Sequence, residues 1–510
     1  MALSRKVKLG YALGHVFNDL CASMWFTYLL VYLQYVLQLD RGLSGFFLMV
    51  GQIADALATP LVGIQSDRGS GFCRYGRRKS WHALGSVLVA VSFPFIFMLC
   101  WECWGYMGPL YIIMIGFMIC VFQFGWASSQ VSHLALIPDL TPVESEREEL
   151  NLLRYIFDVG SDVLVYLVAW VVLAGDPNWD RSINPSDASS FKTITVVVMI
   201  VGIFFTIVFH ALTPEPPTSA GGGVFNGAYQ RTSREEREAD EEEEGPVERE
   251  DTERGSADGE GEERPQMRWR DWLQNTQFYH LSVLYACSRL VANLANIYMP
   301  IYLEETLHTR QELIAVVPLV MSLSGVGASF LLRLLRKGLG KKSSLVVGIV
   351  VGLLSCTISS LTWMPEWLVY ITAVLWGVSG SLMVVLSLAL ASSLISHNVD
   401  SSAFVYGSLS FTDKIVNGVV VLIIQELTRV TCDGDNCTDY YRSVMSLGIF
   451  IPLVVAFIFV CLLSRHKFRR NRNKDALGEG DDQENSSASD SSELLLASTT
   501  NLGYGSVTKA

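Results

Sequence analysis

The stretch YALGHVFNDLCASMWFTYLLVYLQYV, residues 11–36, sets the fold of this chain. It is predominantly apolar and at least as long as a bilayer-spanning helix requires, roughly 20 residues. Soluble helices of this length carry a polar face, which such segments mostly lack. The sequence predicts an all-α integral membrane protein with twelve such spans, at residues 11–36, 43–64, 81–100, 107–137, 150–174, 191–211, 277–303, 312–334, 343–363, 366–395, 404–428 and 440–464.

The spans fall into two groups of six. We predict an N-terminal six-helix bundle (1–212), a disordered acidic cytosolic linker (213–276), a C-terminal six-helix bundle (277–464) and a disordered cytosolic tail (465–510). Residues 213–267 hold 17 acidic and 6 basic residues, so this segment accounts for most of the net charge of −12. Acidic sequence of this kind cannot bury enough apolar surface to fold. The membrane part is therefore close to neutral.

The orientation in the membrane follows from the positions of Lys and Arg, which concentrate in cytosolic loops. Basic residues gather before the first span, after the second and eighth, and after the twelfth; they include Arg5, Lys6, Lys8, Arg77, Arg78, Lys79, Lys341, Lys342, Arg469 and Arg470. Both termini and the linker are therefore predicted to be cytosolic.

This orientation places four cysteines on the opposite, luminal or extracellular face. Cys100 and Cys103 form one pair in sequence and Cys432 and Cys437 another, and either pair could form a disulfide there. Asn436 begins an Asn-Cys-Thr glycosylation sequence on the same face.

A loop motif is repeated between the two halves. Gly76-Arg77-Arg78-Lys79-Ser80 follows the second span, and Gly340-Lys341-Lys342-Ser343 follows the eighth. A basic loop with a turn glycine explains the composition but not the duplicated placement. Parallel repeats are typical of the two halves of a major facilitator fold, which holds its substrate between the halves near the membrane midplane.

Acidic and basic side chains lie deep inside only five of the spans. A charge facing lipid is costly, so buried charges mark a substrate or ion path, or form ion pairs that hold or gate the bundle. The second explanation needs no substrate contact, but the set as a whole favours a transporter. These residues are Asp19, Asp55, Arg154, Asp158, Asp162, Arg289, Asp413 and Lys414.

Arg154, Asp158 and Asp162 are four residues apart and share one helix face. Carboxylates come chiefly from the first half, whereas cations come from both halves. A zwitterion suits such a cavity, with its carboxylate on Arg or Lys and its ammonium on Asp.

Two histidines lie near these charges. His15 precedes Asp19 by four residues and shares its helix face, and His133 lies in the fourth span. A histidine beside a carboxylate is able to relay protons near neutral pH; the alternative is a satisfied polar spacer. Gln123, Gln130 and Ser132 in the fourth span are candidate cavity residues.

Several longer motifs resemble known transporters. Residues 14–19 (GHVFND), 55–63 (DALATPLVG) and 411–414 (FTDK) resemble the glycoside–pentoside–hexuronide cation symporters, a branch of the major facilitator superfamily. Residues 18–30, 122–128 and 403–408 more closely resemble a group of that superfamily associated with lysosomes and melanosomes, required for cysteine import into the lumen and influencing pigmentation. The resemblance implies a cysteine transporter of these membranes, working by alternating access.

The resemblance also implies roles for single residues. Asp19 and Arg154 match sugar-contacting positions of the symporter branch, Asp55 matches a cation-coordinating carboxylate, and Lys414 matches a characteristic lysine. Two carboxylates of that branch are replaced, by Thr59 and by Gln130. Fewer anionic oxygens weaken sodium binding, so we expect proton coupling or simple facilitation.

The predicted tail contains two sorting signals. The segment from Asp490 to the leucine pair Leu494 and Leu495 fits the acidic dileucine pattern. Tyr504 to Val507 fits the tyrosine-based pattern. Such addresses are read by receptors and do not anchor the chain. They predict clathrin adaptors as partners.

These expectations combine into one hypothesis. Asp19, Asp55, Arg154 and Lys414 are expected to contact substrate or protons, with gating or supporting roles for Asp158, Asp162, Arg289, Asp413, His15 and Gln130. Another small solute, such as a sugar or a different amino acid, and a non-transporting membrane scaffold or sensor are the alternatives. The sequence shows no nucleotide, structural-metal, hydrolytic or nucleic-acid site, and we expect no enzyme activity and no cofactor.

Overall fold

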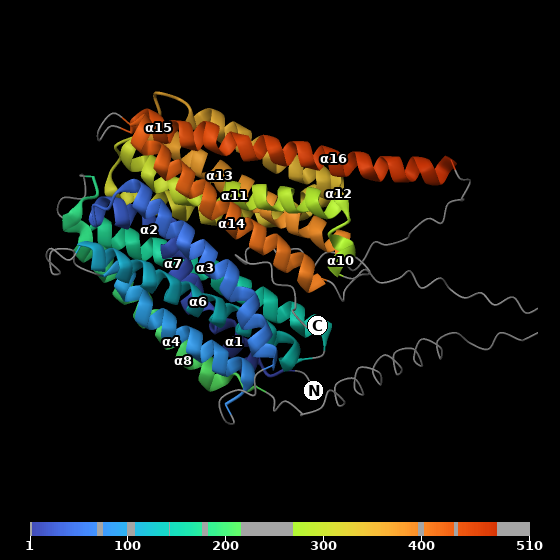
Figure 1. Ribbon diagram of the computed structural model, residues 1–510, viewed down its shortest axis with the longest axis horizontal. Coiled ribbons are helices and arrows are strands. Elements are labelled where there is room, and N and C mark those ends of the chain that lie inside the picture. Colours follow the sequence, from blue (N-terminus) through green and yellow to red (C-terminus); the bar gives the residue numbers. More distant parts are fainter. Residues whose placement is uncertain are drawn as a thin grey trace, which may run out of the picture.

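The computed structural model describes residues 3–68, 75–98, 108–141, 143–175, 182–215, 269–395, 402–432 and 437–476. Within these ranges, eleven helices are long and apolar enough to cross a membrane. Figure 1 shows two bundles side by side, the first half in blue to green and the second in yellow to red. Helix α3 packs on α14, α7 on α12 and α2 on α11 across their interface.

The first half contains the six spans predicted for it. Its first span is built from α1, α2 and a π-helical segment, and its sixth begins with a short 3-10 turn. The elements are α1 (Arg5–Leu13), α2 (Val16–Val31), the π-helical segment Tyr32–Val36, α3 (Arg41–Arg68), α4 (Arg77–Phe97), α6 (Gly108–Leu140), α7 (Glu144–Ala174), the 3-10 turn Pro185–Asp187 and α8 (Ala188–Leu212).

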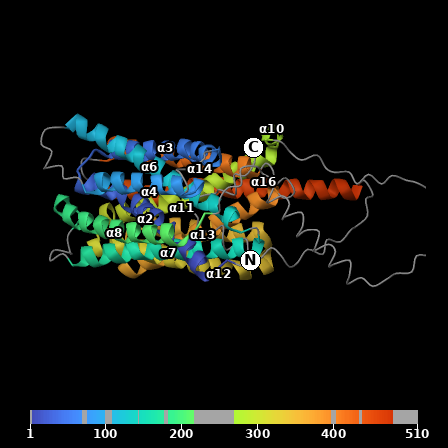
Figure 2. The ribbon, with the colours of Figure 1, turned by 90° about the horizontal axis from the view of Figure 1, so that it is seen from below.

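The second half is built from α10 (Trp269–Trp272), α11 (Thr276–Glu305), α12 (Gln311–Ser359), α13 (Glu366–Ile395), α14 (Ser402–Thr431), α15 (Thr438–Ser443), the π-helical segment Val444–Gly448 and α16 (Ile449–Ala476). Helix α12 comprises two spans, because the backbone leaves the helical conformation at Gly340. Helix α10 lies in the range predicted as linker. The end of α16 lies in the range predicted as tail, and Figure 2 shows it continuing past the other helices.

Helix α11 is the seventh span along the chain and brings the total to twelve, although it is not among the eleven apolar helices. It is 30 residues long and most of its side chains are buried. Because it packs against α13, α14, α16 and α2, it has little surface to present to lipid. Its position at the centre of the bundle therefore permits the polar residues that lower its hydropathy. Within the described residues, the predicted all-α fold of twelve membrane-length helices in two halves is confirmed.

The repeated loop motif has the same conformation in both halves. Gly76 precedes α4 with φ 105°, and Gly340 precedes the second span of α12 with φ 75°. Both values lie in the left-handed region that side chains other than glycine rarely adopt. Four residues later, the hydroxyls of Ser80 and Ser344 each donate to the carbonyl of the glycine, at 2.5 and 2.8 Å. The internal repeat inferred from sequence thus exists as structure.

The first span is broken at Gly14 and His15, between α1 and α2. A break inside a membrane frees backbone carbonyls that water cannot reach, so other groups must satisfy them. His82 on α4 places its Nε2 2.9 Å from the Gly14 carbonyl, and His133 on α6 places its Nε2 2.8 Å from the Tyr11 carbonyl, which also accepts the Gly14 N–H at 3.0 Å. Two histidines from distant helices therefore stabilise the break.

Spans three, six, nine and twelve, which carry none of the charges identified inside spans, expose apolar side chains. Span three is α4, span six is α8, span nine is the second part of α12 and span twelve is α16. Their exposed residues include Leu84, Val87, Val91, Ile200, Phe204, Ile207, Val350, Leu354, Ile451 and Ile458. An apolar surface of this extent matches the hydrocarbon core of a bilayer.

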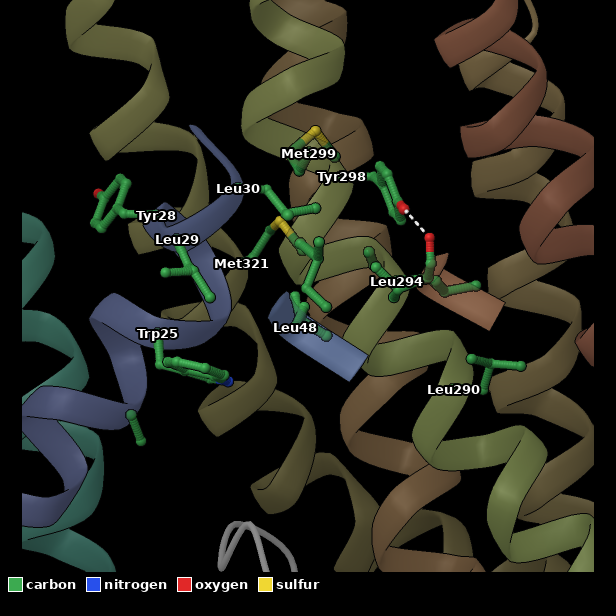
Figure 3. Close-up of a cluster of buried hydrophobic side chains, with 14 of the residues drawn as sticks. Trp25, Tyr28, Leu29, Leu30, Leu48, Leu290, Leu294, Tyr298, Met299 and Met321 are labelled. Atoms are coloured by element: carbon green, nitrogen blue, oxygen red, sulfur yellow. Dashed lines mark hydrogen bonds between the residues drawn. The ribbon is translucent and has the colours of Figure 1, made fainter. Parts of the chain in front are cut away.

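The two ends of the bundle differ. We call the end that carries the Cys432–Cys437 disulfide the disulfide end, and the opposite end, where α4 and α11 begin, the terminus end. Figure 1 shows α15 at the disulfide end and α10 at the terminus end. A cluster of buried apolar side chains is formed by both halves; Figure 3 shows Trp25, Leu29, Leu30, Leu48, Leu294, Tyr298 and Met299 among its members.

Close helix packing predicts a sensitive position at Gly85 on α4. A Cβ there would lie 2.5 Å from the Gly125 carbonyl oxygen and 2.5 Å from the Ser129 backbone nitrogen of α6. Because both are backbone atoms, Gly85→Ala must push two helices apart, and we expect about 1–3 kcal/mol of destabilisation. Thermal unfolding of the purified protein in detergent measures the effect. Gly407→Ala is the matched control, since no heavy atom lies within 4 Å of the added Cβ; equal losses in both variants would contradict this account.

Candidate functional site

A cavity of about 170 Å³ lies between the two halves. Helices α2 and α7 form its wall on one side, and α11, α12 and α13 form the other. Its polar residues are Asp19, Asp158, Asp162, Arg289, Asn293, Asn296, Ser322 and Ser381. Apolar residues such as Ala22, Met321 and Trp376 complete the lining. The cavity therefore lies where a major facilitator fold holds its substrate.

Three carboxyl groups form the wall of the first half. Asp158 and Asp162 lie one turn apart on α7, as their spacing predicted, and Asp19 faces them from α2. Asp162 accepts a hydrogen bond from the Ser23 hydroxyl, and the Asp19 carboxylate lies 2.5 Å from Nδ1 of His15. The first half thus places three acidic groups around one cavity.

A single cation faces the carboxyl groups from the second half, within the described lining. Arg289 on α11 lies 3.2 Å, Nε to Oδ2, from Asp413 on α14. Asp413 also accepts the side-chain amide of Asn417 at 2.5 Å. The Arg289 guanidinium thus reaches the cavity while one edge is held by Asp413.

A second buried ion pair connects the halves directly. Lys414 on α14 places its ammonium 2.6 Å from the Asp55 carboxylate on α3. The Thr59 hydroxyl accepts from the same ammonium at 3.2 Å and donates to Asp55 at 3.0 Å. The ammonium also lies 5.8 Å from the centre of the Trp126 ring. Thr59 thus serves as a hydrogen-bonding partner of the pair.

Arg154 lies behind the cavity wall rather than in the lining. Its Nη2 is 3.1 Å from Nε2 of His15, and Nδ1 of His15 is 2.5 Å from Asp19. Arg154 is almost fully buried. The connection from Arg154 to the cavity therefore passes through His15 and Asp19.

The structure brings the predicted residues into two neighbouring groups. Asp19, Asp158, Asp162 and Arg289 line the cavity, and Asp55, Lys414 and Asp413 lie in ion pairs beside it. Gln130 is buried on α6 outside the lining, and Gln123 lines a smaller void with Trp25 and Trp126.

The sequence analysis missed Asn293 and Asn296. Both follow Arg289 on α11, at spacings of four and seven residues, so the three side chains share one helix face. This pattern was available in the sequence. Within the described residues, no group of three or more His, Cys, Asp and Glu is placed to hold a metal ion.

The two halves are tied together at the disulfide end. Glu305 on α11 accepts from Arg41 at 2.8 Å and from the Tyr35 hydroxyl at 2.9 Å. Nearby, Glu304 accepts the backbone N–H of Ile183 at 2.9 Å. These contacts join the two halves at this end of the bundle.

Several predicted features lie outside the described residues: Cys100 and Cys103, the glycosylation site Asn436, and the sorting residues Asp490, Leu494, Leu495, Tyr504 and Val507. The other cysteine pair is described, and Cys432 and Cys437 form a disulfide.

Two six-helix halves around a charged cavity define a membrane transporter of the major facilitator class. The family described as MFS/sugar transport protein matches residues 10–222 and 248–476, and the chain belongs to this family. Its membership confirms the resemblance inferred from the sequence motifs.

Individual relatives agree with this assignment. Major facilitator superfamily domain-containing protein 12 of Homo sapiens is 38% identical over 460 residues, which cover 87% of this chain and 90% of the relative. The Mus musculus protein of the same name is 36% identical over 486 residues, covering 92% and 96%. Among solved structures, a D-xylose-proton symporter superposes with a TM-score of 0.64 at 12% identity, covering 89% of this chain and 96% of the symporter. That likeness shows the fold alone.

Proposed function

We propose that the protein carries cysteine from the cytosol into the lumen of lysosomes and melanosomes by alternating access. The cavity between the halves carries this proposal, because three carboxyl groups on one wall face a guanidinium on the other. The cysteine cargo and the compartment rest on the motifs that resemble the lysosomal and melanosomal group. In this arrangement the terminus end is cytosolic.

The cavity chemistry suits a small zwitterion. Its volume of about 170 Å³ lies below the range for drug-sized ligands, roughly 300–1,000 Å³. A substrate ammonium donates hydrogen bonds to Asp158 and Asp162, while the substrate carboxylate accepts from Arg289. A short, weakly polar side chain packs against Met321 and Trp376.

Proton coupling is part of the proposal. A proton held by one of the cavity carboxyl groups is displaced when a substrate ammonium takes its place, because the ammonium neutralises the carboxylates instead. The Asp55–Lys414 pair joins the two halves and must separate when they move apart. A proton on Asp55 lowers the cost of that separation, since it removes one of the two buried charges.

The remaining features fit the same compartment. The acidic dileucine and tyrosine signals would direct the protein from the cell surface to lysosomes through clathrin adaptors, and Asn436 would carry a glycan on the luminal face. A sugar or another amino acid carried with a cation is the second candidate, favoured by the family description MFS/sugar transport protein.

Transport of labelled cysteine across the plasma membrane tests the proposal. Replacing Leu494, Leu495 and Tyr504 by Ala is expected to move the protein to the plasma membrane, where the luminal face of the cavity meets the medium. Cysteine efflux from loaded cells into acidic medium then reports the proposed direction. Excess unlabelled sugars and amino acids identify the preferred substrate.

Asp158→Asn in this background is expected to weaken cysteine binding. The lost hydrogen bond to a charged group is worth about 1.5–3 kcal/mol, so we expect about a 10- to 150-fold rise in the half-saturating concentration. Asp439→Asn is the matched control, because the Asp439 side chain is 91% exposed and lies on α15, away from the cavity. Surface protein that moves no cysteine would refute the cargo, and efflux indifferent to Asp158→Asn would refute the site.

A further inference from the structure

Four histidines of the first half form a row from the cavity wall toward the terminus end. They come from four different places: His15 at the break of the first span, His133 on α6, His82 on α4 and His210 on α8. The ring centres are 5.5 Å apart from His15 to His133, 5.9 Å from His133 to His82 and 4.9 Å from His82 to His210. The first three side chains are almost completely buried, and His210 is partly exposed.

The hydrogen bonds of the fold fix which ring nitrogens carry hydrogen. A carbonyl oxygen only accepts, so Nε2 of His133 and of His82 must donate to Tyr11 and Gly14. In the neutral ring, Nδ1 is then an acceptor. Nδ1 of His82 lies 3.0 Å from Nε2 of His210, which therefore carries the hydrogen between them.

Two ring nitrogens in the row carry no hydrogen and accept no hydrogen bond within the described residues. Nδ1 of His133 and Nδ1 of His210 are buried and have no hydrogen-bond partner within the described part of the chain. A buried acceptor without a partner costs free energy, and ordered water is its usual partner in such places. Each of these nitrogens accepts a proton without breaking a hydrogen bond that the fold requires.

The row has a proton-exchanging group at each end. At the cavity, Nδ1 of His15 and the Asp19 carboxylate are 2.5 Å apart and hold one proton between them. At the terminus end, His210 lies beside the exposed Tyr75, with 5.6 Å between ring centres. The other titratable groups around the row are Tyr11 on α1, Lys79 on α4 and Arg154 on α7. Lys79 and Arg154 are positively charged, so they raise the free energy of a protonated imidazole ring nearby. A proton that reaches the row is therefore passed on rather than held there.

We propose that this row is a proton relay between the cavity and the cytosol, a proposal that deepens and rests on the proton coupling given above. Its three stations are the Asp19–His15 pair, His133 at Nδ1 and the His82–His210 pair at Nδ1 of His210. A proton leaves the Asp19–His15 pair, passes through water to each station in turn and enters cytosolic water from His210. Each station gains one proton and loses one, so only N–H and O–H bonds form and break.

The relay gives the cavity carboxyl groups a route to cytosolic protons that is separate from the path of the substrate. Asp19 is then able to release its proton while the halves are closed at the terminus end. Such a route permits proton release and substrate movement to occur in different conformations.

Proton flux through surface-directed protein tests the relay without depending on the cargo. A cytosolic pH-sensitive fluorescent protein follows cytosolic pH after the medium is acidified, with and without added cysteine. His133→Gln and His210→Gln remove a station, while the Gln amide N–H is able to replace the original donor. We expect each to slow acidification about tenfold or more, as for the loss of a proton-transferring group.

His280→Gln on α11 is the matched control. His280 packs against Phe459 of α16, and both residues belong to the second half, whereas the row lies in the first half. Exchange of labelled for unlabelled cysteine at equal pH on both sides should persist in all three variants, which shows that they fold. His210 holds no carbonyl of the helix break, so His210→Gln stays informative even if His133→Gln is unstable.

The possible outcomes separate the two proposals. Histidine-dependent proton flux without cysteine transport would support the relay and overturn the cargo. Cysteine exchange with proton flux unchanged in both histidine variants would overturn the relay and leave the transporter proposal standing. The absence of proton flux in the unmodified protein, with or without cysteine, would also overturn the relay.

Discussion

Lys414→Met is expected to abolish transport and to lower the free energy of unfolding by about 3–5 kcal/mol, the cost of leaving one member of a buried ion pair unpaired. Asp55 and Lys414 are both almost fully buried, and their charged atoms are 2.6 Å apart. Without the ammonium, Asp55 keeps only the Thr59 hydroxyl as a side-chain donor within the described contacts. An ionised carboxylate in that position is poorly compensated.

A double substitution separates stability from function. Asp55→Asn combined with Lys414→Met removes both charges, and replacing a buried pair by neutral groups is often without cost. We therefore expect the double variant to regain most of the thermal stability but not the pH dependence of cysteine transport. Lys192→Met on α8 is the control, because Lys192 is exposed. Equal stability of Lys414→Met and the unmodified protein would show that the pair contributes little.

Cross-linking Gln52→Cys to Gly418→Cys is expected to stop transport completely and reversibly. The Cβ of Gln52 on α3 lies 3.2 Å from the position of a Cβ on Gly418 of α14. Disulfides need about 3.5–4.5 Å between Cβ atoms, so a shift of a few tenths of an ångström suffices. The cross-link would fasten the two halves where they must separate for alternating access.

Copper phenanthroline forms the bond, a membrane-permeant phosphine reduces it, and efflux of labelled cysteine is measured after each treatment. Each single cysteine variant receives the same treatments, which also controls for reduction of the native Cys432–Cys437 disulfide. Full transport by cross-linked protein would show that α3 and α14 stay together through the cycle. It would exclude rocking at this contact.

Much of the fold could be predicted because hydropathy marks spans and basic residues mark loops. Most span ends were predicted to within about four residues, although α1 and α7 begin six residues earlier than predicted and α16 continues to Ala476. The duplicated glycine loops showed the two halves. Differences arose where packing overrides local sequence. The break at Gly14 and His15 interrupts a continuous apolar run, and its stabilising partners His82 and His133 lie 68 and 122 residues away from the carbonyls they bind.

The candidate site was predictable in its residue types but not in its pairings. Charges inside spans identified Asp19, Asp158, Asp162 and Arg289, all of which line the cavity. Their partners were not evident, because Arg289 and Asp413 are 124 residues apart and Thr59 and Lys414 are 355 apart. Arg154 was assigned to the substrate by resemblance, whereas the structure places it against His15.

The polarity of α11 has a consequence for biosynthesis. A charged residue at the centre of a helix costs about 2.5–3.5 kcal/mol on insertion from the translocon, and α11 carries Arg289 without the apolar excess of the other spans. Its counter-charge, Asp413, is synthesised 124 residues later. Helix α11 must therefore be retained by neighbours already inserted, such as α2, until α14 emerges from the ribosome. The second half of the protein reaches its final arrangement only when synthesis is nearly complete.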